Sequence, residues 1–365
     1  MNFSGSYRQG EVEFLLKRLP LHDFVDVPRK EYLIQSGQRH YSEMLSPEVL
    51  PSARYLDVFR QACAANNERM ARDCLSLASL IAARRSGAIT LVSLARAGTP
   101  VGVVLGRLLN GVLGRPAHHY SVSIIRDRGI DSNALDYILA QGHAAESIIF
   151  IDGWTGKGVI AAELRNTIAA FNVRHGTAID GGLYVLSDLA GTAACAASCD
   201  DYLIPSSILN ATVSGLVSRS ILNEAIGPGD FHGCVYYQQF EQHDQSQAFA
   251  DDLVAAATAQ ARAPATAVAA SSEATAAAAA AVSRAFMQQA LRQHGIDDVN
   301  LVKPGIGEAT RVLLRRTPRL LIVRDAAAVD VAHLLVLAQE KQVPVMVDGS
   351  LPYHAVSLIR SALDA

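Results

Sequence analysis

The sequence predicts an α/β protein with a mostly parallel central sheet and a smaller α/β/α unit near its C-terminal end. Short apolar runs rich in β-branched residues alternate with segments of helical spacing, as in a parallel sheet covered by helices. An Ala-rich stretch at 255–283 interrupts this alternation, and a shorter alternation follows it. We therefore expect a domain at 1–254, a partly helical linker at 255–283, and a domain at 284–365 that folds separately.

The expected elements follow in order along the chain. Residues 1–50 are polar without a clear period, and they either decorate the surface or form a hood over a pocket. After Pro51, helical spacing runs over 53–84, with a candidate break at Asn66. The remaining strands are expected at 88–94, 120–125, 147–151, 183–186, 202–204, 299–302, 320–323 and 344–347, and the helices at 101–109, 159–171, 282–293 and 331–340.

Composition narrows the class of protein. The chain has 365 residues, a formal net charge of -3 and 50% hydrophobic residues, so it can bury more than one core and has no global basic excess for nucleic acid. No apolar run is long enough to span a membrane. Five cysteines without a paired framework favour a reducing compartment, so we expect a cytoplasmic protein. Cys195 and Cys199 fit neither a zinc nor a redox CxxC spacing and are expected to be small core residues.

The strongest candidate site begins where the strand at 147–151 ends. Asp152 stands at that end, and a glycine-rich loop with Thr155 and Lys157 leads into the next helix. A strand, a glycine loop and a helix together form a phosphate site, because bare N–H groups and the positive end of the helix dipole face the anion. The spacing is not that of a Walker P-loop. An ordinary strand-to-helix turn is the alternative.

This loop resembles the PRPP-binding loop of type I phosphoribosyltransferases, although it is shorter and has one acid where that family usually has two. The resemblance implies that Asp152 acts in catalysis by holding ribose hydroxyls, directly or through Mg²⁺ that also binds the substrate diphosphate. It further implies a set of residues around the 5′-phosphate, namely Gly153, Thr155, Gly156, Lys157 and Gly158.

A second strand–loop–helix unit precedes the first. Its loop resembles the Arg-Ala-Gly or Arg-Gly-Gly pyrophosphate loop of the same family, which implies pyrophosphate contacts from Ala95, Arg96, Ala97, Gly98 and Thr99. A solvated loop charge is the alternative for Arg96. Between the two loops, a charged turn carries Arg126 and Arg128, and the resemblance implies that they close over the substrate and neutralise the leaving pyrophosphate. A solvated hairpin tip is the alternative there.

Contacts to an acceptor are expected from polar residues in the hood and after the strand at 202–204. The candidates are His40, Tyr41, Glu43, Ser207 and Asn210. Helix capping is the competing role for Ser207.

The C-terminal segment resembles the L7Ae/Pelota RNA-binding module, whose loop is Gly-x-Asn-Glu followed by Thr-Lys. Gly307 stands where that family has the Asn that contacts RNA. The resemblance and the local excess of basic residues imply RNA contacts from Lys303, Gly305, Gly307, Glu308, Arg311 and Arg315. A solvated basic face is the alternative.

Over nearly its whole length the chain resembles the StiP family, which is associated with tellurite-resistance and stress gene clusters and is labelled cysteine protease. The main expectation is a PRPP-dependent phosphoribosyltransferase. It would transfer the 5-phosphoribosyl group from PRPP to a base-like acceptor, or run the reverse reaction. One alternative is a non-catalytic nucleotide sensor that holds RNA. The other is a thiol protease in which Cys195 or Cys199 reacts, although no cysteine stands in a recognisable nucleophile context. The acceptor and any homo-oligomer are left open.

Overall fold

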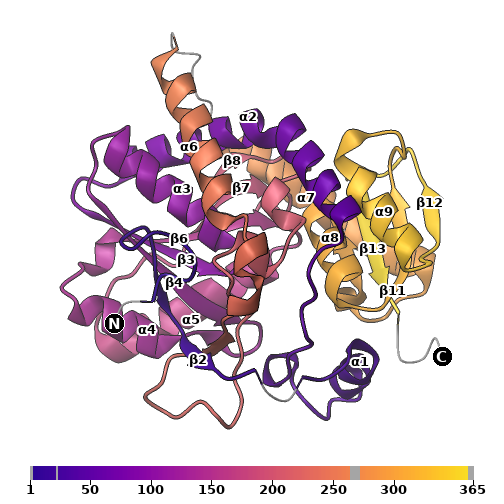
Figure 1. Ribbon diagram of the computed structural model, residues 1–365, viewed down its shortest axis with the longest axis horizontal. Helices are drawn as coiled ribbons and strands as arrows, with labels where there is room; N and C mark the ends of the chain where they lie inside the picture. The colour runs from indigo at the N-terminus through magenta and orange to yellow at the C-terminus, as the bar shows by residue number, and fades with distance from the viewer. Residues whose placement is uncertain (1–2, 22–23, 264–271, 361–365) are drawn as a thin grey trace.

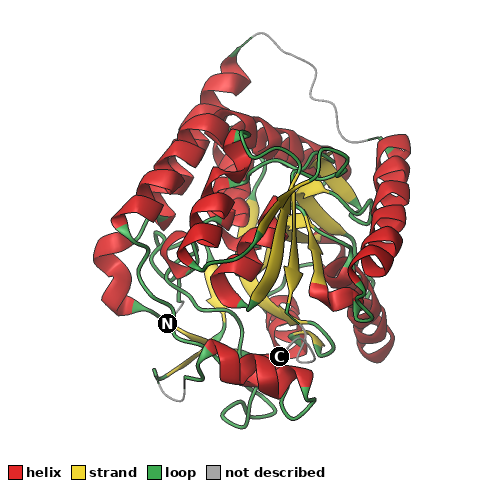
Figure 2. Ribbon diagram, turned by 90° about the vertical axis from the view of Figure 1, so that its right-hand side faces the viewer, coloured by secondary structure: helices red, strands yellow, loops and turns green. Residues whose placement is uncertain are grey.

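The computed structural model describes residues 3–21, 24–263 and 272–360, and its centre is a mostly parallel sheet between layers of helices (Figures 1 and 2). The strand order is β1-β4-β3-β6-β7-β8, and every neighbouring pair on this path is parallel. The strands are β1 (Glu13–Leu15), β3 (Ile89–Ala95), β4 (Ala117–Ile125), β6 (Ile148–Thr155), β7 (Leu183–Asp188) and β8 (Cys195–Ser198), with β5 (Gly129–Ile130) antiparallel to β4. The predicted α/β class with a parallel sheet is confirmed.

Helices cover both faces of this sheet because the strands are apolar on both faces. The helices are α2 (Ala53–Arg84), α3 (Gly98–Gly111), α4 (Ser132–Ala140), α5 (Val159–His175) and α6 (Ser246–Arg262). Residues of α2, α3 and α6 belong to one hydrophobic cluster, and residues of α4 and α5 belong to the cluster on the other face. The predicted helix at 53–84 is confirmed without a break, because Asn66 stays helical and its amide donates to Asp330 Oδ1 at 3.1 Å.

Two expectations for the core were wrong. The edge strand is β8 at 195–198 and not the segment 202–204, because backbone pairing with β7 selects the small-residue run. Residues 1–50 also hold regular structure: β1, β2 (Lys17–Leu19) and α1 (Val27–Gln35). The two short strands are stabilised by pairing with distant strands, β1 with β4 and β2 with β9 (Gly233–Val235). Their own sequences therefore show no periodic pattern that would predict them.

The C-terminal unit has its own four-stranded sheet in the order β10-β13-β11-β12. Its elements are α7 (Glu273–His294), β10 (Val302–Pro304), α8 (Ile306–Arg315), β11 (Pro318–Val323), α9 (Ala332–Glu340), β12 (Val345–Val347) and β13 (Ala355–Ile359). The predicted smaller α/β unit is confirmed, and β13 at its centre is an addition to the predicted elements. Among the described helices, none is long and apolar enough to cross a membrane.

The two units pack against each other, and the yellow C-terminal segment lies directly beside the rest of the chain (Figure 1). Ile306, Ala309 and Leu313 of α8 belong to the same hydrophobic cluster as Trp154 and Leu203 of the core. The tail is therefore docked on the core, and its separate folding stays a prediction.

The predicted linker is helical over most of its described residues. Residues 255–262 continue α6, and 273–283 begin α7, whose residues pack closely on Gly191, while 264–271 lie outside the described residues. The stated domain boundaries themselves stay a prediction.

Substitution of Gly98 tests how closely α3 packs against the sheet. A side chain at Gly98 would clash with the backbone carbonyl of Ile151, so α3 can approach β6 only with glycine there. We expect Gly98→Ala to lower the free energy of unfolding by about 1–3 kcal/mol, as measured by urea denaturation. Gly111→Ala, at the open end of the same helix, is the matched control and should be neutral or slightly stabilising. Equal effects of the two substitutions would contradict the packing argument.

Candidate functional site

The candidate site lies at the carboxyl edge of the central sheet, between β3 and β6. The chain leaves β3 for β4 on one side, while β6 pairs with β3 on the other, so this is the point where strand order reverses. Open α/β sheets form their ligand crevices at such points. Arg96 follows the end of β3, and Asp152 lies on β6 beside it. The structure thus joins two predicted loops at one place.

A chamber of about 210 Å³ opens there and is lined by four arginines from both units. Arg96 and Arg219 belong to the core, whereas Arg311 and Arg315 project from α8. Asp152 is the acidic residue in its lining. The chamber therefore depends on contact between the units.

The arginines are held mostly by neutral oxygens. Arg96 pairs with Glu48 at 2.7 Å and donates to the carbonyl of Val217 at 2.8 Å. Asn210 Oδ1 accepts from Arg96 Nη2 at 3.0 Å and from Arg315 Nε at 2.8 Å, so one amide joins the two units. Burial, followed by the neighbouring arginines, holds the pKa of Arg315 well below its ordinary value.

Arg219 completes the cluster from the side of the N-terminal segment. Its guanidinium donates to the carbonyl of Tyr41 at 2.8 Å and to that of Met44. Burial lowers the pKa of Arg219 to about 10, so it stays charged at neutral pH.

Asp152 is buried, and its carboxylate Oδ1 accepts from the backbone N–H of Gly153 at 2.8 Å. Burial raises the pKa of Asp152 to about 6, against the opposing effect of Arg311. A carboxyl group with this pKa exchanges a proton near neutral pH.

A second, wider pocket of about 480 Å³ adjoins the chamber and shares Tyr41, Asp152, Trp154 and Arg311 with it. The Arg311 guanidinium lies 4.3 Å from the Trp154 ring centroid and pairs with Glu308 at 2.7 Å. Gly307 packs so closely on Trp154 that a side chain there would come within 2.7 Å of the indole. Gly307, which stands where the resembled family has Asn, therefore lies at a contact with the core that leaves no room for a side chain.

The predicted phosphate loop is largely engaged by protein groups. The Thr155 hydroxyl donates to the Asp188 carboxylate, and Gly156 packs on Glu308. Lys157 donates to the carbonyl of Val299 at 2.6 Å, and burial with the repulsion of Lys303 lowers the pKa of Lys157 to about 7. Phosphate binding by Gly153, Thr155, Gly156, Lys157 and Gly158 stays a prediction, and a ligand would have to displace these contacts.

The N-terminal segment lies over the charged turn. The backbone N–H of Arg126 donates to the Tyr41 hydroxyl at 2.8 Å, Arg128 lies 3.6 Å from Glu43, and His40 lies 3.9 Å from Asp127. Tyr41 and Arg126 line the wider pocket. The segment thus has the position predicted for a hood, and acceptor contacts from it stay a prediction.

The residues predicted to bind RNA face the core. Gly305 approaches Leu189, Gly307 packs on Trp154, and Lys303 lies 4.0 Å from Glu308. Arg311 lines both cavities and Arg315 lines the chamber. The alternative of a solvated basic face does not fit these residues, because docking of α8 turns them toward the core, and RNA contacts from them stay a prediction.

Metal binding through Asp152 has limited support from side chains. Within the described ranges, no group of three or more His, Cys, Asp or Glu side chains is arranged to hold a metal ion. Mg²⁺ at Asp152 stays a prediction that requires oxygen ligands from a bound molecule.

The cysteines differ in access to solvent. Cys74, Cys195 and Cys234 are buried, whereas Cys63 and Cys199 are half-buried. Burial raises the pKa of Cys63 and of Cys234 to about 12 and also raises the pKa of Cys195. The prediction of a small core residue fits Cys195 and does not fit Cys199.

Three residues of the site were missed in the sequence: Glu48, Trp154 and Arg219. Glu48 and Arg219 come from loops far from Arg96 in the chain, and no spacing links them to it. Trp154 is the single tryptophan and stands inside the predicted loop, so it was the one available signal.

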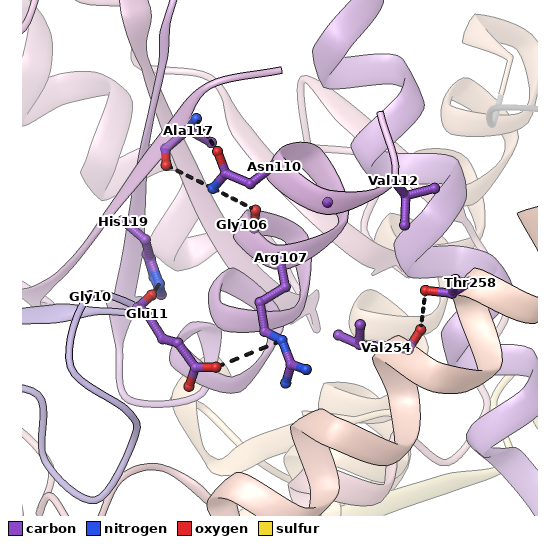
Figure 3. Close-up of a pocket in the computed structure, with 11 residues that line it drawn as sticks. Gly10, Glu11, Gly106, Arg107, Asn110, Val112, Ala117, His119, Val254 and Thr258 are labelled. Atoms are coloured by element: carbon purple, nitrogen blue, oxygen red, sulfur yellow. Dashed lines mark hydrogen bonds and ion pairs between the residues drawn. The ribbon is translucent and has the colours of Figure 1, made fainter. Parts of the chain in front are cut away.

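A separate pocket of about 480 Å³ lies between the start of the chain, α3 and α6 (Figure 3). Glu11 approaches Arg107 at 3.7 Å, and Asn110 donates to the carbonyls of Gly106 and Ala117. Burial lowers the pKa of His119 to about 3, so its imidazole is neutral. Because its polar side chains already bond other groups of the protein, this pocket is a weaker candidate than the arginine chamber.

Comparison with known proteins bears on the function. A family model described as "Tellurite-like stress resistance cysteine protease StiP" matches residues 5–254, and one described as "PELOTA RNA binding domain" matches residues 281–361. A curated protein named "Cysteine protease StiP" from Acinetobacter baylyi is 41% identical over 370 residues, covering 98% of this chain and 94% of the relative. Both resemblances stated from the sequence, to StiP and to the Pelota module, are confirmed.

The same findings overturn the main functional expectation. A PRPP-dependent phosphoribosyltransferase is wrong, because the family model and the relative both name a cysteine protease, which is a hydrolase. PRPP and a base-like acceptor lose their support as partners. The alternative of a thiol protease is the one that these names favour.

Asp152 gives the site a measurable pH dependence. The pKa of Asp152 is about 6 in the folded state and about 3.9 in the unfolded state. Between these two pH values the folded state binds more protons than the unfolded state. The contribution of Asp152 to stability therefore falls as pH rises. Asp152→Asn should therefore gain on the order of 2–3 kcal/mol relative to the wild type between pH 4 and pH 7. Denaturant titrations at both pH values measure this, with Asp57→Asn on α2 as control. A stability difference between Asp152→Asn and the wild type that does not change with pH would show that the pKa of Asp152 is not raised.

Proposed function

Because the chain belongs to the StiP family of tellurite-like stress resistance cysteine proteases, we propose that it is a cysteine-dependent peptidase. The observation that carries this proposal is the 41% identity over 98% of the chain, since it spans both units and not one module. The reaction class is acyl transfer to a thiolate followed by hydrolysis.

Cys199 is the cysteine best suited to be the nucleophile. It directly follows β8, at the carboxyl edge of the parallel sheet, and it is half-buried. Open α/β sheets bind their ligands at that edge. Cys63, the other half-buried cysteine, lies within α2, and burial raises its pKa to about 12, which disfavours the thiolate.

Groups that thiol chemistry uses interact with Asp200, the residue that follows Cys199 in the chain. The next residue, Asp200, pairs with Arg69 at 2.6 Å. The imidazole of His354 lies in the field of both charges, and burial, followed by Arg324, lowers its pKa, so it is neutral at pH 7. A nearby cation favours a thiolate, and a neutral imidazole can take up a proton. Arg324 donates to His354 Nε2 at 2.6 Å and would have to release it.

The proposed reaction balances without a cofactor. The thiolate sulfur attacks the peptide carbonyl carbon, the C–N bond breaks, and the leaving amine takes up a proton. Water then attacks the resulting thioester, which releases the acid and restores the thiol.

Substitution of single cysteines tests the proposal. Cys199→Ser should lower hydrolysis of a fluorescent casein or peptide library by about 1,000-fold or more, whereas Cys63→Ser, the matched half-buried control, should retain activity. Mass spectrometry after brief iodoacetamide treatment should find selective alkylation of Cys199 at neutral pH. Retained activity in Cys199→Ser would exclude it as nucleophile, and a folded wild type without hydrolysis would exclude the peptidase.

A second candidate function, RNA binding, is favoured by the match of residues 281–361 to the Pelota RNA-binding family. Lys303 and Arg311 line the wider pocket, so a single strand that entered between the units would meet both cations. Gly307 stands where the resembled family has an Asn that contacts RNA. Without that side chain, recognition would come mainly through contacts to phosphates.

Salt dependence tests RNA binding by the full chain. Affinity for a single-stranded RNA should fall with salt, with a log–log slope of roughly -0.7 for each phosphate contact. Arg311→Ala should reduce that slope by about one contact. Arg174→Ala, at an exposed position near the end of α5, is the control and should leave the slope unchanged. Salt-independent affinity, or none at low salt, would count against an RNA role.

The strand order of the core supports a proposal about its architecture. We infer that it shares the architecture of type I phosphoribosyltransferases without their activity. The reversal of strand order beside β3, with Arg96 and Asp152 at the crevice, supports this comparison.

A further inference from the structure

The arginine chamber between the units carries more positive charge than its partners neutralise. Arg96 pairs with Glu48 at 2.7 Å, and Arg311 pairs with Glu308 at 2.7 Å. Arg219 and Arg315 form no ion pair within the described ranges, and they donate to carbonyl and amide oxygens. Both guanidinium groups are half-buried, and cations that face only neutral acceptors in a partly desolvated cavity are stabilised when an anion joins them.

Hydrogen-bond donors around the chamber also lack partners. Arg96 Nε, Arg219 Nη1 and Ser207 Oγ are buried, and none has a partner among the described residues. All three residues line the chamber, and Arg96 and Ser207 are only 6% and 5% exposed. Buried donors are nearly always satisfied in folded proteins. These three atoms are closed off from solvent, so a ligand rich in acceptors would bond them after a small shift of their side chains.

We propose that this chamber binds the phosphate group of a small phosphate monoester, held jointly by Arg96, Arg219 and Arg315. A monoester dianion supplies two negative charges for the two arginines that form no ion pair, and its three terminal oxygens can accept hydrogen bonds from guanidinium groups. Guanidinium groups suit this role because their planar fork pairs with phosphate oxygens.

The shape of the cavity favours a small ester over a polymer. The chamber of about 210 Å³ holds a phosphate and little more, and it adjoins the wider pocket at Tyr41, Asp152 and Trp154. The organic part of the ligand therefore extends toward Asp152, whose carboxyl can bond a hydroxyl group. An RNA phosphodiester carries one charge per phosphate and would leave one arginine uncompensated.

The ligand would also join the two units. Arg96 and Arg219 come from the core, and Arg315 comes from α8, where Asn210 already connects Arg96 with Arg315. Binding should therefore protect α8 from hydrogen exchange. This site is independent of the proposed peptidase centre, since neither Cys199 nor His354 lines the chamber.

Calorimetry on the full chain tests the proposal with glycerol 3-phosphate, inorganic phosphate and glycerol. We expect the ester to bind and glycerol not to bind. Arg315→Gln should weaken ester binding at least about tenfold. Arg319→Gln, at an exposed position on β11 of the same unit, should change it by less than about twofold.

Several outcomes would overturn the proposal. They are no binding of the ester by the wild type, binding of inorganic phosphate without the ester, or unchanged affinity in Arg315→Gln. Circular dichroism verifies that this variant is folded. If it is not, Ser207→Ala decides, because it removes one donor without changing charge and should weaken binding by about two- to tenfold.

Discussion

The carboxylate of Asp201 fastens the C-terminal unit to the core, and the site depends on that attachment. One oxygen accepts from the backbone N–H of Ile306 at 2.9 Å and the other from that of His354 at 2.7 Å. Ile306 begins α8, so the carboxylate also lies at the positive end of a helix dipole. Burial raises the pKa of Asp201 to about 6, while these N–H groups oppose the rise. The interaction is costly to desolvate and costly to break.

Attachment at Asp201 determines what α8 brings to the crevice. With the helix start held there, Gly307 meets Trp154, Arg311 stacks on the indole, and Arg315 reaches Asn210. The core alone would expose Trp154 and leave the chamber open on one side. A module whose relatives are described as RNA-binding thus supplies structural parts of a cavity in the core.

Desolvation explains why ionisable groups around the crevice depart from their ordinary behaviour. Burial pushes the pKa of Asp152 upward and the pKa values of Lys157 and Arg219 downward, in each case toward the neutral form. Burial also raises the pKa of Cys63, Cys74, Cys195 and Cys234. Proteins keep such costly groups together where they bind or react, and the proposed anion site at the arginine chamber follows from that principle.

The sequence by itself determined the elements whose pattern is local. The helix at 53–84, the strands before Arg96 and Asp152, and the α/β class follow from apolar periodicity, which is a property of neighbouring residues. The relation to StiP and Pelota families was also visible in contiguous motifs. Tertiary structure decided the rest. The pairing of β1 with β4, the meeting of Glu48, Arg96 and Arg219, and the inward turn of Arg311 and Arg315 all join residues distant in the chain. Such contacts arise from packing and desolvation between surfaces, and no spacing along a single chain encodes them.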